Sequence, residues 1–155
     1  MSFRIQGLAP KAFEHLFGLD QAALRAHHAR RVVADQAPGY PDRIQLRDAM
    51  PGESLLLLNY THQPAANPYR ASHAIYLLEG STSAYDECDQ VPPALALRTL
   101  SVRAFDACDE LIDGDLVEGE ELPALVNRLF ANQNAAYLHA HYARYGCFAA
   151  RIDRA

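Results

Sequence analysis

Four consecutive leucines, Leu55 to Leu58, constrain the fold more than any other stretch of this sequence. A run of aliphatic side chains without polar alternation is typical of a strand that is covered on both faces. A period of two then resumes, so Tyr60 and His62 share one face of the strand with Leu58. The run therefore predicts a central strand of a sheet, with two hydrogen-bonding aromatic side chains in line with its core face.

The rest of the chain predicts more strands than helices, without regular alternation between them. Helices are expected near 10–17 and 20–28, where Asp20 is the N-cap candidate, and near 120–132. Strands are expected near 3–8, 30–35, 43–47, 54–62, 72–80, 95–107, 109–119, 135–143 and 147–154, with 43–47 and 54–62 forming a hairpin or at least two sequential strands. The predicted fold class is α+β: a largely antiparallel sheet with two N-terminal helices and one helix before a C-terminal hairpin.

Length and composition bound the architecture and the partners. With 155 residues, the chain is expected to form a single domain spanning 1–155. Its 50% hydrophobic and 21% charged residues are typical of a soluble globular protein. A net charge of -5 gives no attraction for nucleic acid or for anionic lipid, so we expect neither a nucleic-acid partner nor a membrane partner.

Location and cofactors follow from what the sequence lacks. Its longest aliphatic run, 55–58, is far shorter than the roughly 20 residues of a spanning helix, and no signal peptide is recognisable. The cysteines Cys88, Cys108 and Cys147 are odd in number and widely spaced, which indicates reduced thiols. No nucleotide-binding or calcium-binding motif occurs. We therefore expect a cytoplasmic protein without a cofactor.

The segment YLHAHY contains the sharpest candidate chemistry. Tyr137, His139 and His141 alternate, so they line one face of the predicted strand. Two imidazoles on one face can bind a metal ion with His62 or His73, although no carboxylate or thiol stands at a ligand spacing. We therefore assign no metal site, and His62, His139 and His141 are the residues that would form one. For a reaction, His139 and His141 are the acid–base candidates, since imidazole titrates near neutrality.

The last predicted strand contributes Cys147 and Arg151, which a strict period of two would place on one face. The register of the hairpin decides whether that face is shared with the imidazoles. There, Arg151 would bind a carboxylate or phosphate, and Cys147 would be a candidate nucleophile activated by His141 or Arg151. Two alternatives remain open: Arg151 pairs with a surface acid, and Cys147 is a buried apolar side chain.

The segment 59–73 is unusually rich in hydrogen-bonding side chains. Tyr69 offers an aromatic ring and a hydroxyl group, and Arg70 can either bind an anion or tie the loop to the sheet. Loops positioned by a rigid sheet often carry function. Together with Tyr60 and His62, these two residues are therefore ligand-binding candidates, and a loop bonded to its own scaffold is the alternative.

Several motifs follow one another in a recognisable order. After the opening FRIQGL come RDAMPGE, NYTHQPAANPYRASH and GCFAARIDR. In this order, and across nearly the whole chain, the sequence resembles a bacterial family of domains of unknown function, the one numbered 1203. The resemblance implies a stand-alone domain of this length. It implies no activity, cofactor or catalytic residue.

These observations support three hypotheses about function. The first is a soluble domain that binds, and in a catalytic version transforms, a small anionic molecule in a cleft lined by Tyr60, His62, Tyr69, Arg70, His139, His141 and Arg151. The second is a non-catalytic interaction module, a homodimer that pairs through an exposed edge strand or through Tyr137, Tyr142, Tyr145 and Phe148. The third is a metal-binding domain that uses the HxH pair.

Overall fold

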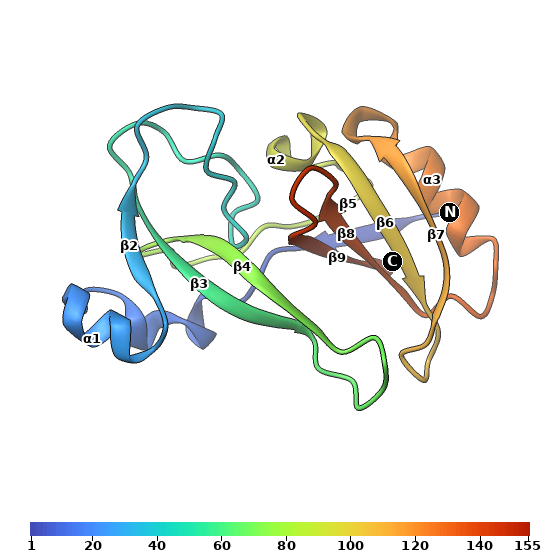
Figure 1. Cartoon of the computed structure of the whole chain (residues 1–155). Coiled ribbons are helices and arrows are strands. Elements are labelled where there is room, and N and C mark those ends of the chain that lie inside the picture. Colours follow the sequence, from blue (N-terminus) through green and yellow to red (C-terminus); the bar gives the residue numbers. More distant parts are fainter.

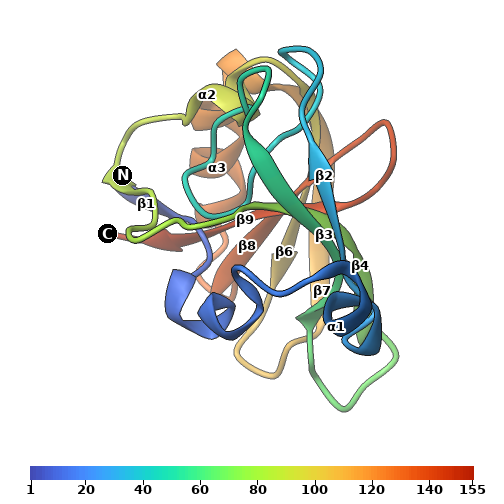
Figure 2. The same ribbon diagram turned by 90° about the vertical axis from the view of Figure 1, so that its left-hand side faces the viewer.

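The computed structural model describes residues 1–155 and contains two antiparallel sheets that lie side by side (Figures 1 and 2). The larger sheet has the strand order β5-β1-β9-β8-β6-β7, and the smaller one has the order β2-β3-β4. The strands are β1 Phe3–Gln6, β2 Arg30–Val33, β3 Ser54–Gln63, β4 Ala71–Leu78, β5 Asp86–Cys88, β6 Thr99–Phe105, β7 Leu111–Glu118, β8 Tyr137–Tyr142 and β9 Phe148–Arg154. The α+β class and the C-terminal hairpin are confirmed.

The helices are short and lie outside the sheets. They are α1 Gln21–Ala26, α2 Pro93–Ala96 and α3 Leu122–Phe130, with 3-10 turns at Pro10–Ala12, Glu14–Leu16 and Gly119–Glu121. The predicted N-cap is confirmed, because the Asp20 carboxylate accepts a hydrogen bond from Ala23 N at 2.8 Å. None of the helices is long and apolar enough to cross a membrane.

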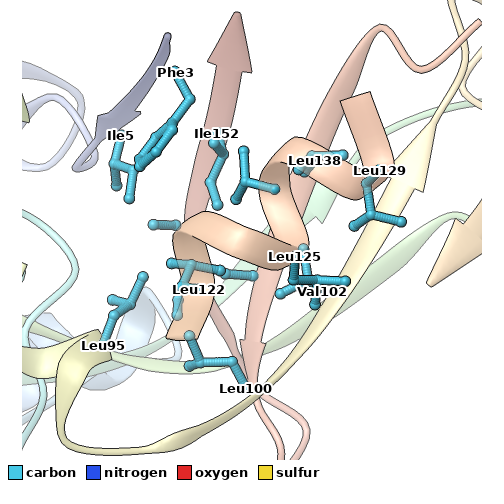
Figure 3. Close-up of a cluster of buried hydrophobic side chains, with 14 of the residues drawn as sticks. Phe3, Ile5, Leu95, Leu100, Val102, Leu122, Leu125, Leu129, Leu138 and Ile152 are labelled. Atoms are coloured by element: carbon cyan, nitrogen blue, oxygen red, sulfur yellow. The ribbon is translucent and has the colours of Figure 1, made fainter. Parts of the chain in front are cut away.

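Helix α3 builds the main core on one face of the larger sheet. Leu122, Leu125 and Leu129 form one apolar stripe of the helix, and all three are buried. They pack over Val102 of β6 and Leu138 of β8 (Figure 3). Because neighbouring residues of a strand point to opposite faces, this arrangement directs the odd-numbered residues of β8 away from α3 and toward the smaller sheet.

The leucine run lies at the centre of the smaller sheet, as predicted. Leu56 and Leu58 pack on one side with Leu24 of α1, and Leu55 packs on the other side with Ala49. Since β3 lies between β2 and β4, both of its edges are paired from Leu55 to Leu57, and Leu58 pairs with β4 alone. The expectation of a central strand that is covered on both faces is confirmed.

The predicted hairpin of 43–47 with 54–62 is wrong, because β3 pairs with β2 and β4 instead. The earlier segment makes only isolated bridges, one of them between Asp42 and Tyr76. The buried Asp42 carboxylate accepts hydrogen bonds from the main-chain N–H groups of Leu78, at 2.7 Å, and Gln45. These bonds hold 42–45 in a turn, which prevents a regular strand from forming there.

Two further expectations need correction. The helix expected at 10–17 is a pair of 3-10 turns, since neither turn has a side-chain cap and Gly18 follows with a positive φ of 79°. The stretch 81–94 lies between two predicted strands and has no predicted element of its own, but it contains the start of α2 and the edge strand β5, which pairs with the free side of β1.

Gly7 lies in close contact with the backbone of another segment. A Cβ atom built there would lie 1.9 Å from the Ile44 carbonyl oxygen. That backbone is fixed, because Leu8 N donates to Arg43 O at 2.8 Å and Tyr85 N donates to Ile44 O at 2.8 Å. We expect Gly7→Ala to lower the free energy of unfolding by about 3 kcal/mol, as measured by urea denaturation.

Gly39 provides the matched control for this prediction. A Cβ atom there would meet only the flexible Gln36 side chain, at 3.2 Å. Gly39→Ala should therefore lower the free energy of unfolding much less than Gly7→Ala does. Equal stabilities of the two variants would contradict the close approach of Gly7 to Ile44.

Candidate functional site

Three imidazoles converge in the space between the two sheets. His62 comes from β3, whereas His139 and His141 come from β8 (Figure 2 shows β3 in front of β8). The ring centroid of His62 lies 4.9 Å from that of His141 and 6.1 Å from that of His139, and the centroids of His139 and His141 are 6.3 Å apart. The structure thus brings together the three histidines that the sequence analysis singled out, from positions far apart in the chain.

Phe148 holds the imidazoles in place. Its ring stacks on His62, with centroids 5.3 Å apart and planes only 7° from parallel, and it lies 5.2 Å from His139. A register shift between β8 and β9, after Ala140, places Phe148 opposite His141. An aromatic residue at the start of β9 therefore closes the cluster on one side and removes the imidazoles from solvent.

Three ring nitrogens in this cluster have no hydrogen-bond partner. His141 Nδ1 lies 2.9 Å from Gly146 O, and because a carbonyl only accepts, this nitrogen donates and leaves Nε2 with its lone pair. His141 Nε2, His139 Nδ1 and His62 Nδ1 are all buried without a hydrogen-bond partner. Since buried polar atoms are nearly always paired, three unpaired atoms in one place make this cluster the candidate site.

Burial keeps the imidazoles uncharged. It is the main reason that the pKa falls to about 3 for His139 and His141 and to about 4 for His62. At neutral pH the cluster therefore offers neutral rings, and the nitrogens without a proton can accept hydrogen bonds.

Arg103 of β6 lies beside this cluster. It is paired in register with His139 across the β6–β8 ladder, so both side chains emerge on the same face of the sheet. The guanidinium makes no hydrogen bond or ion pair, burial lowers its pKa, and its charge helps to lower the pKa of the three histidines. On its other side it faces Gly114 of β7, which has no side chain to cover it.

The sequence analysis did not identify Arg103. Its charge is ordinary in a chain with 14 Lys and Arg residues, and only the pairing register shows that it stands next to His139. The period of two within β6 puts Arg103 on the same face as Phe105, whose ring contacts His139 at 5.1 Å between centroids. This weak alternation was the only local signal.

Tyr137, the third member of the predicted face, ties the β3–β4 hairpin to the larger sheet. Its hydroxyl accepts from Gln63 Nε2 at 2.8 Å and donates to Asp109 at 2.6 Å, and Asn67 Nδ2 donates to Asp109 O at 2.9 Å. Burial, with the neighbouring Asp109, raises the pKa of Tyr137 to about 12. Part of the polar segment 59–73 is thus used to dock its own hairpin.

The other predicted ligand residues lie at the margin of the cluster. Tyr60 packs between Phe13 and Phe148, and Tyr69 is 37% exposed against Phe105. Arg70 donates to Pro64 O within its own hairpin turn. Arg151 lies over the Tyr137 ring at 4.1 Å and pairs with Asp153 at 2.8 Å. Of the two predicted arginines, only Arg151 approaches the histidines.

Cys147 does not join the imidazoles. It packs in the core on the α3 side with Tyr142, whereas Arg151 lies over Tyr137 on the histidine side. The register shift between β8 and β9 breaks the strict alternation, so the two residues no longer share a face. In this structure neither His141 nor Arg151 is placed to activate the thiol, and the cationic side chain near it is Arg98.

No group of three or more His, Cys, Asp or Glu side chains is arranged to hold a metal ion. The three rings face one another edge to face or obliquely, at interplanar angles of 50° to 79°. Arg103 adds a positive charge beside them. That charge opposes a dication and favours an anion.

A wide hollow of the molecule lies elsewhere. Its volume is about 790 Å³, and it is lined by Gln21, Arg25, His28, Ala29, Arg30, Arg31, Leu57, Leu58, Asn59 and Ala74. A second hollow of about 490 Å³ adjoins Asp106 and Asn134. Neither includes an imidazole of the cluster. We place the candidate site at the cluster because its polar atoms are buried and unpaired, whereas Arg25 and Arg30 are exposed to solvent.

Comparison with known proteins identifies the family. The model of the family described as Protein of unknown function (DUF1203) matches residues 39–154, so the chain belongs to this family, as the motif order suggested. The match includes β3 to β9 and therefore His62, Arg103, His139 and His141; β1, α1 and β2 precede it. No curated protein and no solved structure matches the chain.

Proposed function

We propose that this protein binds a small anion that carries hydroxyl groups, at a site formed by His62, Arg103, His139 and His141. The observation that carries this proposal is the part-buried, unpaired guanidinium of Arg103 beside three ring nitrogens without partners. An unpaired charge that is removed from water is costly, and a bound carboxylate or phosphate would offset that cost.

The imidazoles define the second part of the ligand. A neutral ring nitrogen that only accepts, as His141 Nε2 does, repels an anionic oxygen but accepts a hydrogen bond from a hydroxyl group. Hydroxy carboxylates and sugar phosphates both combine an anionic group with hydroxyl donors. This shared chemistry fits Arg103 and His141 better than a simple inorganic anion does.

Binding is better supported than catalysis. A general base works best when its pKa lies near the working pH, and burial holds the pKa of His139 and His141 at about 3. Such imidazoles are weak bases in the free protein. His139 and His141 remain the candidate acid–base residues for any reaction, and a bound anion would raise their pKa toward a useful range.

The homodimer hypothesis also stays a prediction, in a narrower form. Tyr137, Tyr142 and Phe148 are buried, so of the four aromatic residues of the C-terminal hairpin only Tyr145, at 73% exposed, is available to a partner. The edge strand β7 keeps an exposed apolar side chain, Leu116, which is 65% exposed.

A thermal-shift panel tests the proposed function. Hydroxy carboxylates and sugar phosphates should raise the melting temperature, whereas uncharged polyols and simple amines should not. At a concentration 100 times Kd, a ligand adds about 2.7 kcal/mol to the free energy of unfolding, which is a readily measured shift. If no anionic compound of the panel raised the melting temperature at millimolar concentration, the result would count against the site.

A further inference from the structure

Strand β3 has a long free edge. It pairs with β4 almost to its end, but β2 pairs only with Ser54–Leu57. Beyond that point, residues 58–62 continue toward the β3–β4 turn with no strand on the β2 side (Figure 1). Asn59 and Thr61 in this stretch are exposed. Alternate main-chain N–H and C=O groups there have no strand partner, so they can form hydrogen bonds with a strand of another chain.

The outer edge of β2 is closed in a way that the free stretch of β3 is not. The Gln21 side chain of α1 accepts from Arg31 N at 3.2 Å and donates to Arg31 O at 3.3 Å. It thereby takes the place of a neighbouring strand at Arg31. The free main-chain edge of β3 begins beyond Leu57, which pairs with Arg30, the first residue of β2. The 790 Å³ hollow lies beside this edge, and Leu57, Leu58 and Asn59 of β3 line it.

The lining of this hollow is basic. Arg25, His28 and Arg30 line it, and the side chains of these three residues make no hydrogen bond or ion pair, whereas Arg31 is neutralised by Glu79 at 2.6 Å. Leu57 of β3 and Ala74 of β4 add apolar surface to the lining. On a chain with a net charge of -5, this is a local concentration of free positive charge next to a free strand edge.

We propose that this hollow binds an extended acidic peptide, which adds a strand to β3 in line with β2. The main-chain bonds would come from the free edge of β3, and the acidic side chains would pair with Arg25, His28 and Arg30. Because β2 runs antiparallel to β3 and begins at Arg30, a peptide in line with it ends with its C-terminal residues next to Arg30. A small anion could use the cations but not the strand edge.

Fluorescence polarisation with a labelled peptide of alternating Glu and Val residues tests the proposal. The peptide should bind, and a peptide of alternating Lys and Val residues should not. Methylating alternate main-chain nitrogens removes the donors that a strand needs, so affinity should fall at least about tenfold. Arg25→Gln and Arg30→Gln should each weaken binding about three- to tenfold, as expected for the loss of one exposed charge pair.

The control is Arg144→Gln, at an exposed arginine in the β8–β9 turn, which should bind the peptide normally. Equal affinity of the methylated and unmethylated peptides would overturn strand addition. The proposal would also fail if Arg25→Gln and Arg30→Gln both bound the peptide with unchanged affinity, or if millimolar citrate displaced the peptide completely. The hollow shares no residue with the cluster of His62, Arg103, His139 and His141. Failure here therefore leaves the proposed small-anion site untouched, and the reverse also holds.

Discussion

Lowering the pH from 6.5 to 4.5 is expected to destabilise this protein strongly, through His139 and His141. Both have a pKa of about 3 in the folded state, well below the ordinary value of 6.5. Between these values the unfolded chain binds more protons than the folded one, so the free energy of unfolding falls as the pH falls. Each imidazole contributes up to about 1.4 kcal/mol per pH unit, and the loss ends below the folded pKa.

The chosen pH window separates the histidines from the carboxylates that form ion pairs, whereas burial raises the pKa of Asp42, so its protonation changes the free energy of unfolding in the opposite direction. Glu53 and Glu79 have pKa values of about 2 because Arg47 and Arg31 bind them, so their contributions are lost mainly below their ordinary pKa of 4.5. Urea denaturation at half-unit steps from pH 7 to 4.5 therefore reports the imidazoles. His62, with a pKa of about 4, contributes in the same window, so the three imidazoles together make up to about 4 kcal/mol per pH unit.

Single variants identify the source of this slope. His139→Gln removes one of three titrating groups, so the slope should fall by about a third whatever the stability of the variant at pH 7. His15→Gln, at an exposed histidine, is the control and should keep the full slope. A flat profile for the unchanged protein would show that the imidazoles are solvated in solution, and the argument for a buried site would be lost.

Periodicity within single strands predicted much of this arrangement. The leucine run gave a central strand, and the alternation in YLHAHY gave one face shared by Tyr137, His139 and His141. Both inferences depend only on the fixed geometry of a strand, in which the direction of a side chain follows from its position. His62 was named with His139 and His141 as part of one candidate cleft, but periodicity within a strand does not show that two strands meet.

Relations between strands were harder to predict. The sequence places Cys147 and Arg151 on one face, but the register shift after Ala140 separates them, and no local signal marks such a shift. Arg103 becomes relevant only because β6 pairs with β8 in a register that puts it beside His139. Pairing registers depend on packing across the whole sheet, which one strand's sequence does not contain.

The docking of the β3–β4 hairpin explains why polar residues follow the leucine run. Gln63 and Asn67 bond to Tyr137 and Asp109, so the far end of β3 is fixed against the larger sheet. This anchoring positions His62 over β8. Gln63 and Asn67 therefore stabilise the packing of the hairpin, while the imidazole of His62 that they position keeps an unpaired nitrogen. The two alternatives for the segment 59–73, a loop bonded to its scaffold and a ligand site, describe different residues of it.

Replacing Arg103 should separate stability from binding. The free protein bears the cost of a part-buried charge without a partner, so Arg103→Met, which keeps the apolar stem, should raise the free energy of unfolding by about 1 kcal/mol. The same change removes the charge-assisted bonds to the anion, so affinity for the best ligand of the thermal-shift panel should fall roughly 100-fold. Calorimetry and urea denaturation measure the two effects independently.

Arg151→Met is the matched variant, because Arg151 faces the same side of the sheet but is already paired with Asp153 and half-exposed. It should gain no stability and lose little affinity, since its charge is neutralised in the free protein. A gain in stability together with a loss of binding in Arg103→Met alone identifies a charge that is held for a ligand. If Arg103→Met instead loses stability and binds the anion normally, Arg103 supports the fold, and the assignment of the site to this cluster fails.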